Sequence, residues 1–235
     1  MFFSRLRADI NAAKKNDPAA RSKFEIWLTY SGVHALSWHR VAHFFHKIKF
    51  KLLARMISQT CKFFTGIEIH PAAKIAGGVF IDHGAGVVIG ETAEIEEGVV
   101  IYQGATLGGT GKEKGKRHPT IKKGAVISAG AKVLGGFTVG EYAKIGAGAV
   151  VLKEVPPYAT VVGVPGMVVR INGEKPAEVD LQQEKRDPVL EEICRLREKV
   201  FTLEEKLNKL QDGKDQDKEI NQAEQKGEKD KNENI

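Results

Sequence analysis

The stretch that decides the fold is residues 67–109, IEIHPAAKIAGGVFIDHGAGVVIGETAEIEEGVVIYQGATLGG. It carries an apolar or small residue at every sixth position, and the same period returns after residue 120. Alanine stands two positions before many of these residues. A period of six fits neither an α-helix nor a strand with two faces. The positions are Ile69, Ile75, Ile81, Val87, Ala93, Val99, Ala105, Ile121, Ile127, Val133, Val139, Ile145 and Val151.

This period is typical of a parallel β-helix, in which three short strands make one triangular coil of about eighteen residues. Branched side chains would fill the interior, and Ala and Gly would allow the tight corners. Hexapeptide coils wind left-handed, against the usual right-handed crossover. We therefore predict a mainly β protein: a left-handed parallel β-helix of about four or five coils, with an N-terminal α-helical region and a C-terminal coiled-coil helix.

The repeat is interrupted by GGTGKEKGKRHP, residues 108–119. Ala105 and Ile121 are sixteen residues apart, which is not a multiple of six, so the chain must leave the β-helix and return. We predict an extruded loop, and loops on a rigid scaffold tend to carry function. The loop is not a Walker phosphate loop, because Glu113 follows Lys112 where that motif needs Ser or Thr.

Three regions are predicted along the chain: a helical region at residues 1–65, the left-handed β-helix domain at 66–173, and a tail at 174–235. Within the tail, a heptad of apolar residues at 187–211 predicts a coiled coil. A single amphipathic helix lying on the β-helix is the alternative for this segment. Beyond it the chain has almost no large apolar residues, so we expect a disordered end.

The helical region is predicted from apolar residues at helical spacing between residues 24 and 61. Two or three helices fit there, and Asp17 and Pro18 are expected to start a helix. So few helices cannot form a large core of their own. We expect them to pack on the β-helix or on a partner subunit.

The composition limits the classes of function. The chain has 235 residues, 42% hydrophobic and 28% charged, as in soluble globular proteins. It has no apolar run long enough to span a membrane and no apolar signal segment at its start. Cys61 and Cys194 lie far apart, which favours reduced thiols in a cytoplasmic protein. The net charge is +6. The excess of positive charge lies in residues 1–65, which hold 12 Lys and Arg against 3 Asp and Glu. No nucleic-acid motif accompanies it, so we predict a solvated helix face and no nucleic-acid or membrane partner.

Candidate reactive groups cluster near the start of the β-helix and in the loop. Glu68 and His83 are fifteen residues apart, so adjacent coils can bring them close, and a carboxylate that orients a histidine is what a general base needs. Asp82 stands beside this histidine. A zinc site like that of hexapeptide carbonic anhydrases is the rival, with His70, His83 and His118 as ligands. The closely spaced histidine pairs of that family are missing, so we predict no metal site.

Six motifs carry a resemblance to a known family: IHPAAKI, DHGAGVVIGETAEI, TLGGTGKEKGKRHP, AGAKVLG, KIGAGAVV and VVGVPG. Together they resemble the serine O-acetyltransferases, from Asp17 through Pro165. The resemblance implies transfer of acetyl from acetyl-CoA to the hydroxyl of L-serine, giving O-acetylserine for cysteine biosynthesis, with no permanently bound cofactor.

The resemblance also implies roles for residues of the site. His83 matches the general base, and Glu68 matches the carboxylate that orients it, although many members have Asp there. Asp17 and Asp82 match groups that hold the serine ammonium and side chain. The residues that match the groups gripping its carboxylate are Arg117 and His118. The positions that match the coenzyme A site are Gly109, Ala129, Gly130, Ala147 and Gly148, with Lys112 and Lys144 near the phosphates.

The resemblance further implies a homotrimer whose site is shared between subunits. The helical region is shorter than in the long members that join two trimers, so a single trimer is expected. In the family a C-terminal Ile docks into O-acetylserine sulfhydrylase, and Ile235 fits that pattern. Two alternatives remain: a hexapeptide acetyltransferase acting on a sugar or xenobiotic, and a non-catalytic scaffold that binds the sulfhydrylase.

Overall fold

The computed structural model describes residues 2–111, 114–173, 195–197 and 199–203. Residues 1–177 form one compact unit, and residues 178–235 form a second. In the second unit the described residues are helical, and their apolar side chains are exposed. Most of the predicted coiled coil at 187–211, together with the predicted disordered end and Ile235, lies outside the described residues.

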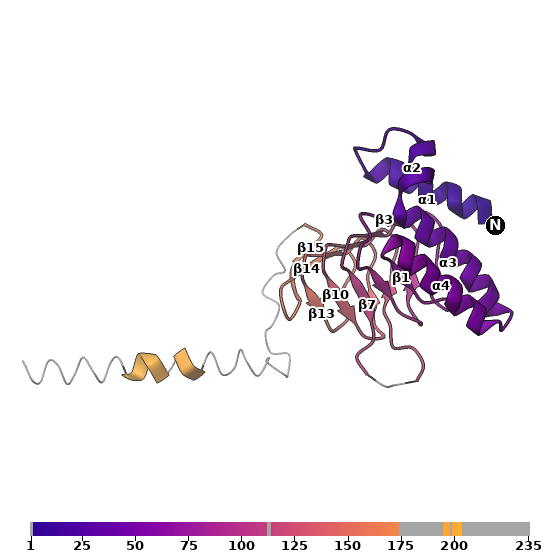
Figure 1. The fold of residues 1–235 in the computed structure, drawn as a ribbon. Helices are drawn as coiled ribbons and strands as arrows, with labels where there is room; N and C mark the ends of the chain where they lie inside the picture. Colours follow the sequence, from indigo (N-terminus) through magenta and orange to yellow (C-terminus); the bar gives the residue numbers. More distant parts are fainter. Residues whose placement is uncertain (1, 112–113, 174–194, 198, 204–235) are drawn as a thin grey trace, which may run out of the picture. The chain divides into compact units, whose positions relative to one another are not determined.

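Four helices precede the strands in the described part of the chain (Figure 1): α1 (Phe2–Asn16), α2 (Lys23–Thr29), α3 (Ser31–Lys47) and α4 (Lys51–Thr65). The last three occupy the segment where two or three helices were predicted, and α1 was missed. The prediction that Asp17 and Pro18 start a helix is wrong. Asp17 follows α1, and its carboxylate caps a turn by accepting the N–H of Ala19 at 2.8 Å. The cap of α2 is Ser22, whose Oγ accepts the N–H of Glu25 at 3.1 Å.

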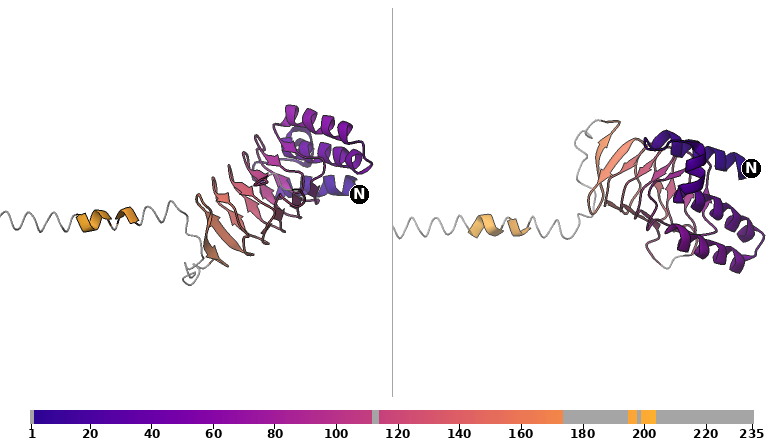
Figure 2. Two further views of the ribbon diagram at one scale, coloured as in Figure 1. Left: turned by 90° about the horizontal axis from the view of Figure 1, so that it is seen from below. Right: turned by 45° about the horizontal axis from the view of Figure 1, so that its top comes forward.

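Within the described residues, fifteen short strands make three sheets, which are the three sides of a parallel β-helix (Figures 1 and 2). Every neighbouring pair is parallel except β14 and β15 at the end. Sheet A contains β1 (Glu68–Ile69), β4 (Val88–Ile89), β7 (Thr106–Gly108), β10 (Lys132–Leu134) and β13 (Val150–Val151). Sheet B contains β2 (Lys74–Ile75), β5 (Glu94–Ile95), β8 (Thr120–Ile121) and β11 (Thr138–Val139). Sheet C contains β3 (Phe80–Ile81), β6 (Val100–Ile101), β9 (Val126–Ile127), β12 (Lys144–Ile145), β14 (Ala159–Val162) and β15 (Met167–Ile171).

The register of sheet A shows where the coils are longer than the repeat. Its successive partners are 20, 18, 26 and 18 positions apart. A regular coil is therefore 18 residues, the first has two extra, and the third has eight extra. The two extra residues lie between Ile81 and Ile89, and the eight lie between Leu107 and Ile121, where the loop stands out from the stack (Figure 1).

The first of these insertions corrects the predicted strand positions. Val87, Ala93, Val99 and Ala105 were predicted to be inward strand residues, but each lies just before its strand and two positions before the residue that points inward. The inward strand residues of those turns are Ile89, Ile95, Ile101 and Leu107. Both sets of residues are buried. The sequence pattern therefore repeats every six residues whichever of the two sets is taken as the inward strand residues.

The helices pack on the first coil, as expected. Gly32 of α3 lies so close to β3 that a Cβ there would be 2.1 Å from the carbonyl oxygen of Ile81. On α4, Ser58 Oγ donates to the carbonyl of Ile69 at 2.6 Å. Figure 2 shows the N-terminal helices, in indigo and purple, gathered at this end of the stack. The first coil is therefore held in place by helices on one side and by the next coil on the other.

A buried ion pair fixes α1. Asp9 of α1 meets Arg40 of α3 at 2.5 Å, and its other carboxylate oxygen accepts the N–H of Gly78 at 2.9 Å. Both side chains are almost entirely buried. Removing either partner would leave an uncompensated charge inside the protein, so the pair makes the position of α1 specific.

Two sequence expectations concern the cellular environment. Among the described residues, no helix combines the length and the hydropathy that crossing a bilayer requires. Cys61 is a free, buried thiol whose pKa is raised by burial. Cys194 lies outside the described residues.

Burial of His39 makes the stability of the protein dependent on pH. His39 lies on α3 and is only 5% exposed, and desolvation lowers its pKa to about 3. In the unfolded chain His39 has a pKa of about 6.5, so below that pH it binds a proton that it does not bind in the folded chain. Between pH 7.5 and pH 5 this one group should lower the free energy of unfolding by about 2 kcal/mol.

The measurement is chemical unfolding at both pH values and one protein concentration, for the wild type and for His39→Gln. The amide of Gln replaces the ring without a titratable group, so the variant should lose about 2 kcal/mol of the pH dependence. Equal pH dependence in the two proteins would show that His39 does not carry the effect.

Candidate active site

The first insertion forms an exposed corner between sheets C and A, which we call the CA corner: residues 82–87 and the turns stacked below them at 102–105, 128–131 and 146–149. His83 has φ +56° there, a left-handed conformation that is uncommon outside glycine and clusters at functional sites. Its side chain is 76% exposed, and its Nε2 lies 3.9 Å from a carboxylate oxygen of Asp82. The corner therefore presents an imidazole to solvent beside a carboxylate.

Asp17 and Tyr30 reach the CA corner from the connections between the first three helices. The hydroxyl of Tyr30 donates a short hydrogen bond to the Asp17 carboxylate. That bond is the main cause that lowers the pKa of Asp17, and it raises the pKa of Tyr30 to about 12. His83 is among the lesser electrostatic causes that lower the pKa of Asp17, so the two side chains lie within electrostatic range of each other. The structure thus brings together Asp17, Asp82 and His83.

Below His83 the CA corner has a floor of glycine backbone. Gly86, Gly104, Gly130 and Gly148 have φ of 74°, 68°, 69° and 67°. A Cβ on Gly104 would lie 3.5 Å from the Cα of Gly130. Side chains at these glycine positions would therefore cover the backbone that is now exposed. The result is a flat strip of backbone that starts at the exposed imidazole. Such a strip accepts the close approach of an extended ligand.

Four of the seven predicted coenzyme A residues lie on this strip: Ala129, Gly130, Ala147 and Gly148. Lys144 is exposed on the neighbouring strand β12. Gly109 lies at a different corner, where a Cβ would be 3.0 Å from the carbonyl oxygen of Arg117. Lys112 lies outside the described residues. Gly86 and Gly104 were not predicted to belong to this strip, because the strand positions after Ile81 were predicted two residues too early.

Glu68 faces helix α4 in this chain. Its carboxylate meets Lys62 at 2.6 Å and Arg55 at 3.5 Å, and the hydrogen bond from Lys62 is the main cause that lowers its pKa. In the described part of the chain, Glu68 is not among the ion-pair or hydrogen-bond partners of His83. Glu68 was predicted to lie close to His83 because the two are fifteen residues apart. That prediction did not take into account that α4 provides Lys62 and Arg55 as partners for the Glu68 carboxylate.

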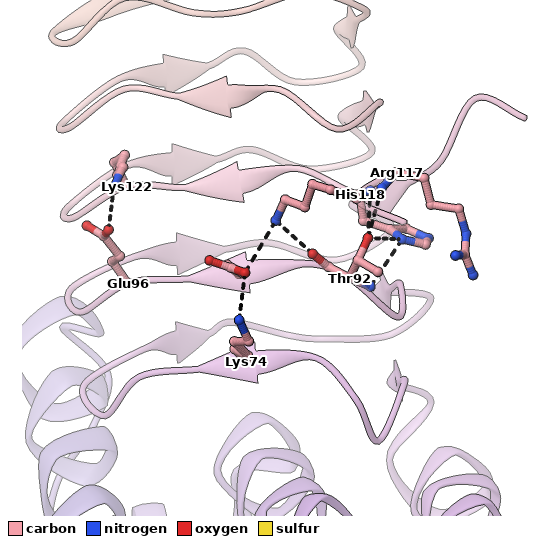
Figure 3. Close-up of polar contacts among 8 residues, drawn as sticks. Lys74, Thr92, Glu96, Arg117, His118 and Lys122 are labelled. Carbon is pink, nitrogen blue, oxygen red and sulfur yellow. Dashed lines mark hydrogen bonds and ion pairs between the residues drawn. The ribbon is translucent and has the colours of Figure 1, made fainter. Parts of the chain in front are cut away.

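Arg117 and His118 lie at the end of the extruded loop, on the AB corner: the turns between sheets A and B at residues 70–73, 90–93 and 108–119 (Figure 3). Arg117 pairs with Glu91, and His118 is 8% exposed with its Nδ1 2.9 Å from the hydroxyl of Thr92. Sheet A separates this corner from the CA corner. One chain therefore places the predicted base and the predicted carboxylate clamp at two different corners.

Sequence reasoning missed Tyr30, Glu91 and Thr92 as partners of site residues. Tyr30 lies within the span of the resemblance, and the other two lie in its motif DHGAGVVIGETAEI, but these contacts were not predicted. Thr92 lies 26 positions before His118, the same offset that pairs Glu94 with Thr120 in sheet B. That offset becomes predictable only when the eight-residue insertion is placed correctly.

Comparisons with known proteins agree with this geometry. A family model described as "Bacterial transferase hexapeptide (six repeats)" matches residues 118–153. A serine acetyltransferase of Bacillus subtilis (strain 168) is 58% identical over 207 residues, which cover 88% of this chain and 95% of that protein. A serine acetyltransferase of Staphylococcus xylosus is 49% identical over 216 residues, covering 92% and 97%.

Solved structures give the same result. A serine acetyltransferase of Neisseria gonorrhoeae superposes with a TM-score of 0.72 at 39% identity, covering 79% of this chain and 72% of that one. A serine acetyltransferase from Brucella abortus strain S19, solved in complex with coenzyme A, gives 0.71 at 44% identity, covering 74% and 70%. The parallel sheets, the hexapeptide match and these neighbours fit the left-handed β-helix predicted from the repeat.

Proposed function

This chain belongs to the serine acetyltransferase family, so it is an acyltransferase that makes O-acetylserine for cysteine biosynthesis, and we propose that His83 is its general base and acetyl-CoA its acetyl donor. The observation that carries this assignment is that the His83 imidazole is exposed in the first turn of the CA corner, next to the strip of glycine backbone. Relatives have been solved in complex with serine and with coenzyme A, which supports these two substrates.

The proposed reaction uses one histidine twice. His83 takes the proton of the serine hydroxyl as that oxygen attacks the thioester carbonyl of acetyl-CoA. The tetrahedral intermediate then collapses, the carbon–sulfur bond breaks, and the proton on His83 goes to the departing sulfur. The products are O-acetylserine and coenzyme A, and the histidine returns to its starting state. The glycine strip would hold the pantetheine arm so that its thioester meets the imidazole.

Substrate recognition divides between the two corners. Asp17 and Asp82 are the proposed partners of the serine ammonium, and the hydrogen bond from Tyr30 supports Asp17 as a carboxylate. Arg117 and His118 are the proposed partners of the serine carboxylate, with the guanidinium offering paired donors. Glu68 is the proposed orienting carboxylate of His83. Since its partner within one chain is Lys62, this role requires Glu68 to change partners when the site assembles.

We infer a homotrimer because sheet A separates the two corners within one chain. A threefold arrangement would place the CA corner of one protomer against the AB corner of the next, so that each site takes His83 from one chain and Arg117 from its neighbour. The coiled coil predicted at 187–211 is proposed to join the same three chains. A cytoplasmic location remains part of the proposal, and the free thiol of Cys61 is compatible with it.

The substrate assignment predicts the outcome of an acceptor panel. With acetyl-CoA and a thiol-release readout, L-serine should be the best acceptor among amino acids, aminosugars and aminoglycosides. His83→Ala should lower kcat by roughly a hundredfold to ten-thousandfold, the usual contribution of a general base. The trimer should persist by light scattering. Comparable rates with an aminosugar would contradict the substrate, and a folded wild type without any acetyl transfer would favour a scaffold.

The shared site predicts complementation between two inactive variants. His83→Ala and Arg117→Ala would each spoil every site in their own trimers. In trimers reassembled from equal amounts of both, about a quarter of the sites would join an intact His83 to an intact Arg117, because each cyclic interface combines two protomers. Serine acetylation should therefore return to about a quarter of the wild-type rate. Activity no higher than the mean of the two variants would place the whole site within one chain.

The C-terminal residue predicts a partner. We propose that Ile235 docks into O-acetylserine sulfhydrylase at the end of the tail. Deleting Ile235 should abolish co-purification of the two proteins and leave serine acetylation unchanged, because Ile235 is not among the proposed catalytic or substrate-binding residues. Deleting Asn234 while keeping a terminal Ile is the matched control and should preserve binding. Undiminished binding after loss of Ile235 would contradict this partner site.

A further inference from the structure

Thr92 uses all of its polar atoms on the three residues that end the loop (Figure 3). Its Oγ1 accepts the backbone N–H of Arg117 and that of His118, each at 3.0 Å. Its carbonyl accepts a hydrogen bond from Lys116 Nζ at 2.7 Å. Its own N–H donates to His118 Nδ1 at 3.2 Å, and its hydroxyl lies 2.9 Å from the same ring nitrogen.

These contacts determine which ring nitrogen of His118 carries the proton. A backbone N–H can only donate, so His118 Nδ1 must present its lone pair to Thr92. Thr92 Oγ1 already accepts two N–H groups, and its hydroxyl hydrogen is directed to the same Nδ1. An imidazole with an unprotonated Nδ1 carries its proton on Nε2. The His118 ring is therefore neutral, and its only donor is Nε2–H.

The surroundings of Nε2 are shaped for this ring. A Cβ on Gly90 would lie 2.1 Å from His118 Nε2, so a residue with a side chain would displace the imidazole. Burial is the main cause that lowers the pKa of His118, and the charge of Arg117 lowers it further, while Glu91 acts in the opposite direction. Glu91 also holds the guanidinium of Arg117. The two residues Glu91 and Thr92 thus fix both side chains of the clamp.

We propose that Thr92 is a positioning residue that locks His118 in its Nε2–H tautomer, so that His118 serves as a hydrogen-bond donor to the carboxylate of the amino-acid substrate and not as a base. Proton abstraction is thereby left to His83, whose side chain is exposed and carries no such lock. The inference rests on the proposed function, because it assigns His118 to the substrate carboxylate.

The first test compares Thr92→Val with Thr92→Ser. Val has nearly the shape of Thr but leaves the N–H groups of Arg117 and His118 without their acceptor, whereas Ser keeps the hydroxyl. Thr92→Val should raise the KM for L-serine roughly ten- to a hundredfold, the effect of leaving such donors unsatisfied. The KM for acetyl-CoA should change less than about twofold. General damage to the fold would instead raise the KM values of both substrates. Thr92→Ser should restore the KM for L-serine to within about threefold of the wild type.

The second test reads the tautomer directly, by ¹⁵N NMR of the full-length protein labelled in its histidines, with His118→Gln used to identify the resonances. The wild type and Thr92→Ser should show a protonated Nε2 and an unprotonated Nδ1 at neutral pH. Thr92→Val should show a mixture of tautomers.

A protonated Nδ1 in the wild type would overturn the proposal, and so would an unchanged KM for L-serine in a folded Thr92→Val trimer. If Thr92→Val fails to fold, the wild-type spectrum decides. If the wild type does not acetylate L-serine, the proposed function fails, and the spectrum still tests the tautomer lock.

Discussion

Each strand of a regular coil directs one aliphatic side chain into the interior, and the rest of the structure depends on this constraint. Ile69, Ile89, Leu107, Val133 and Val151 stack along sheet A because their coils align strand on strand. Extra residues cannot enter the interior, so they are expelled at a corner. Both insertions in this chain obey the rule, and they supply the two halves of the proposed site.

The helices add what the coils cannot provide. A β-helix offers flat sides and corners, and the turns of the CA corner hold one carboxylate of their own, Asp82, so the second one, Asp17, comes from the helical region. Gly32 lets α3 sit directly on β3, and the buried pair of Asp9 and Arg40 fixes α1 beside it. The connection that carries Asp17 is thereby held within electrostatic range of the CA corner. The short helical region is thus part of the proposed active site.

Two histidines of the proposed site differ in their environment. His83 is held in a left-handed turn with its ring in solvent, so its nitrogens are open to a substrate proton. His118 is buried, and its Nδ1 is engaged by Thr92. The same imidazole group can therefore act as a base at one corner and as a donor at the other. The division follows from hydrogen-bond geometry and burial, because the side-chain chemistry is identical.

The sequence by itself determined the β-helix, the loop at 108–119 and the identity of the reactive side chains, because a period of six and motifs such as DHG and RHP are local features of the chain. It misplaced the strand phase after Ile81, since a shift of two exchanges one buried position for another. Only the tertiary structure decided which partners these side chains have: Lys62 for Glu68, Tyr30 for Asp17 and Thr92 for His118. Those contacts join residues up to 26 positions apart, and their geometry depends on how helices and coils pack.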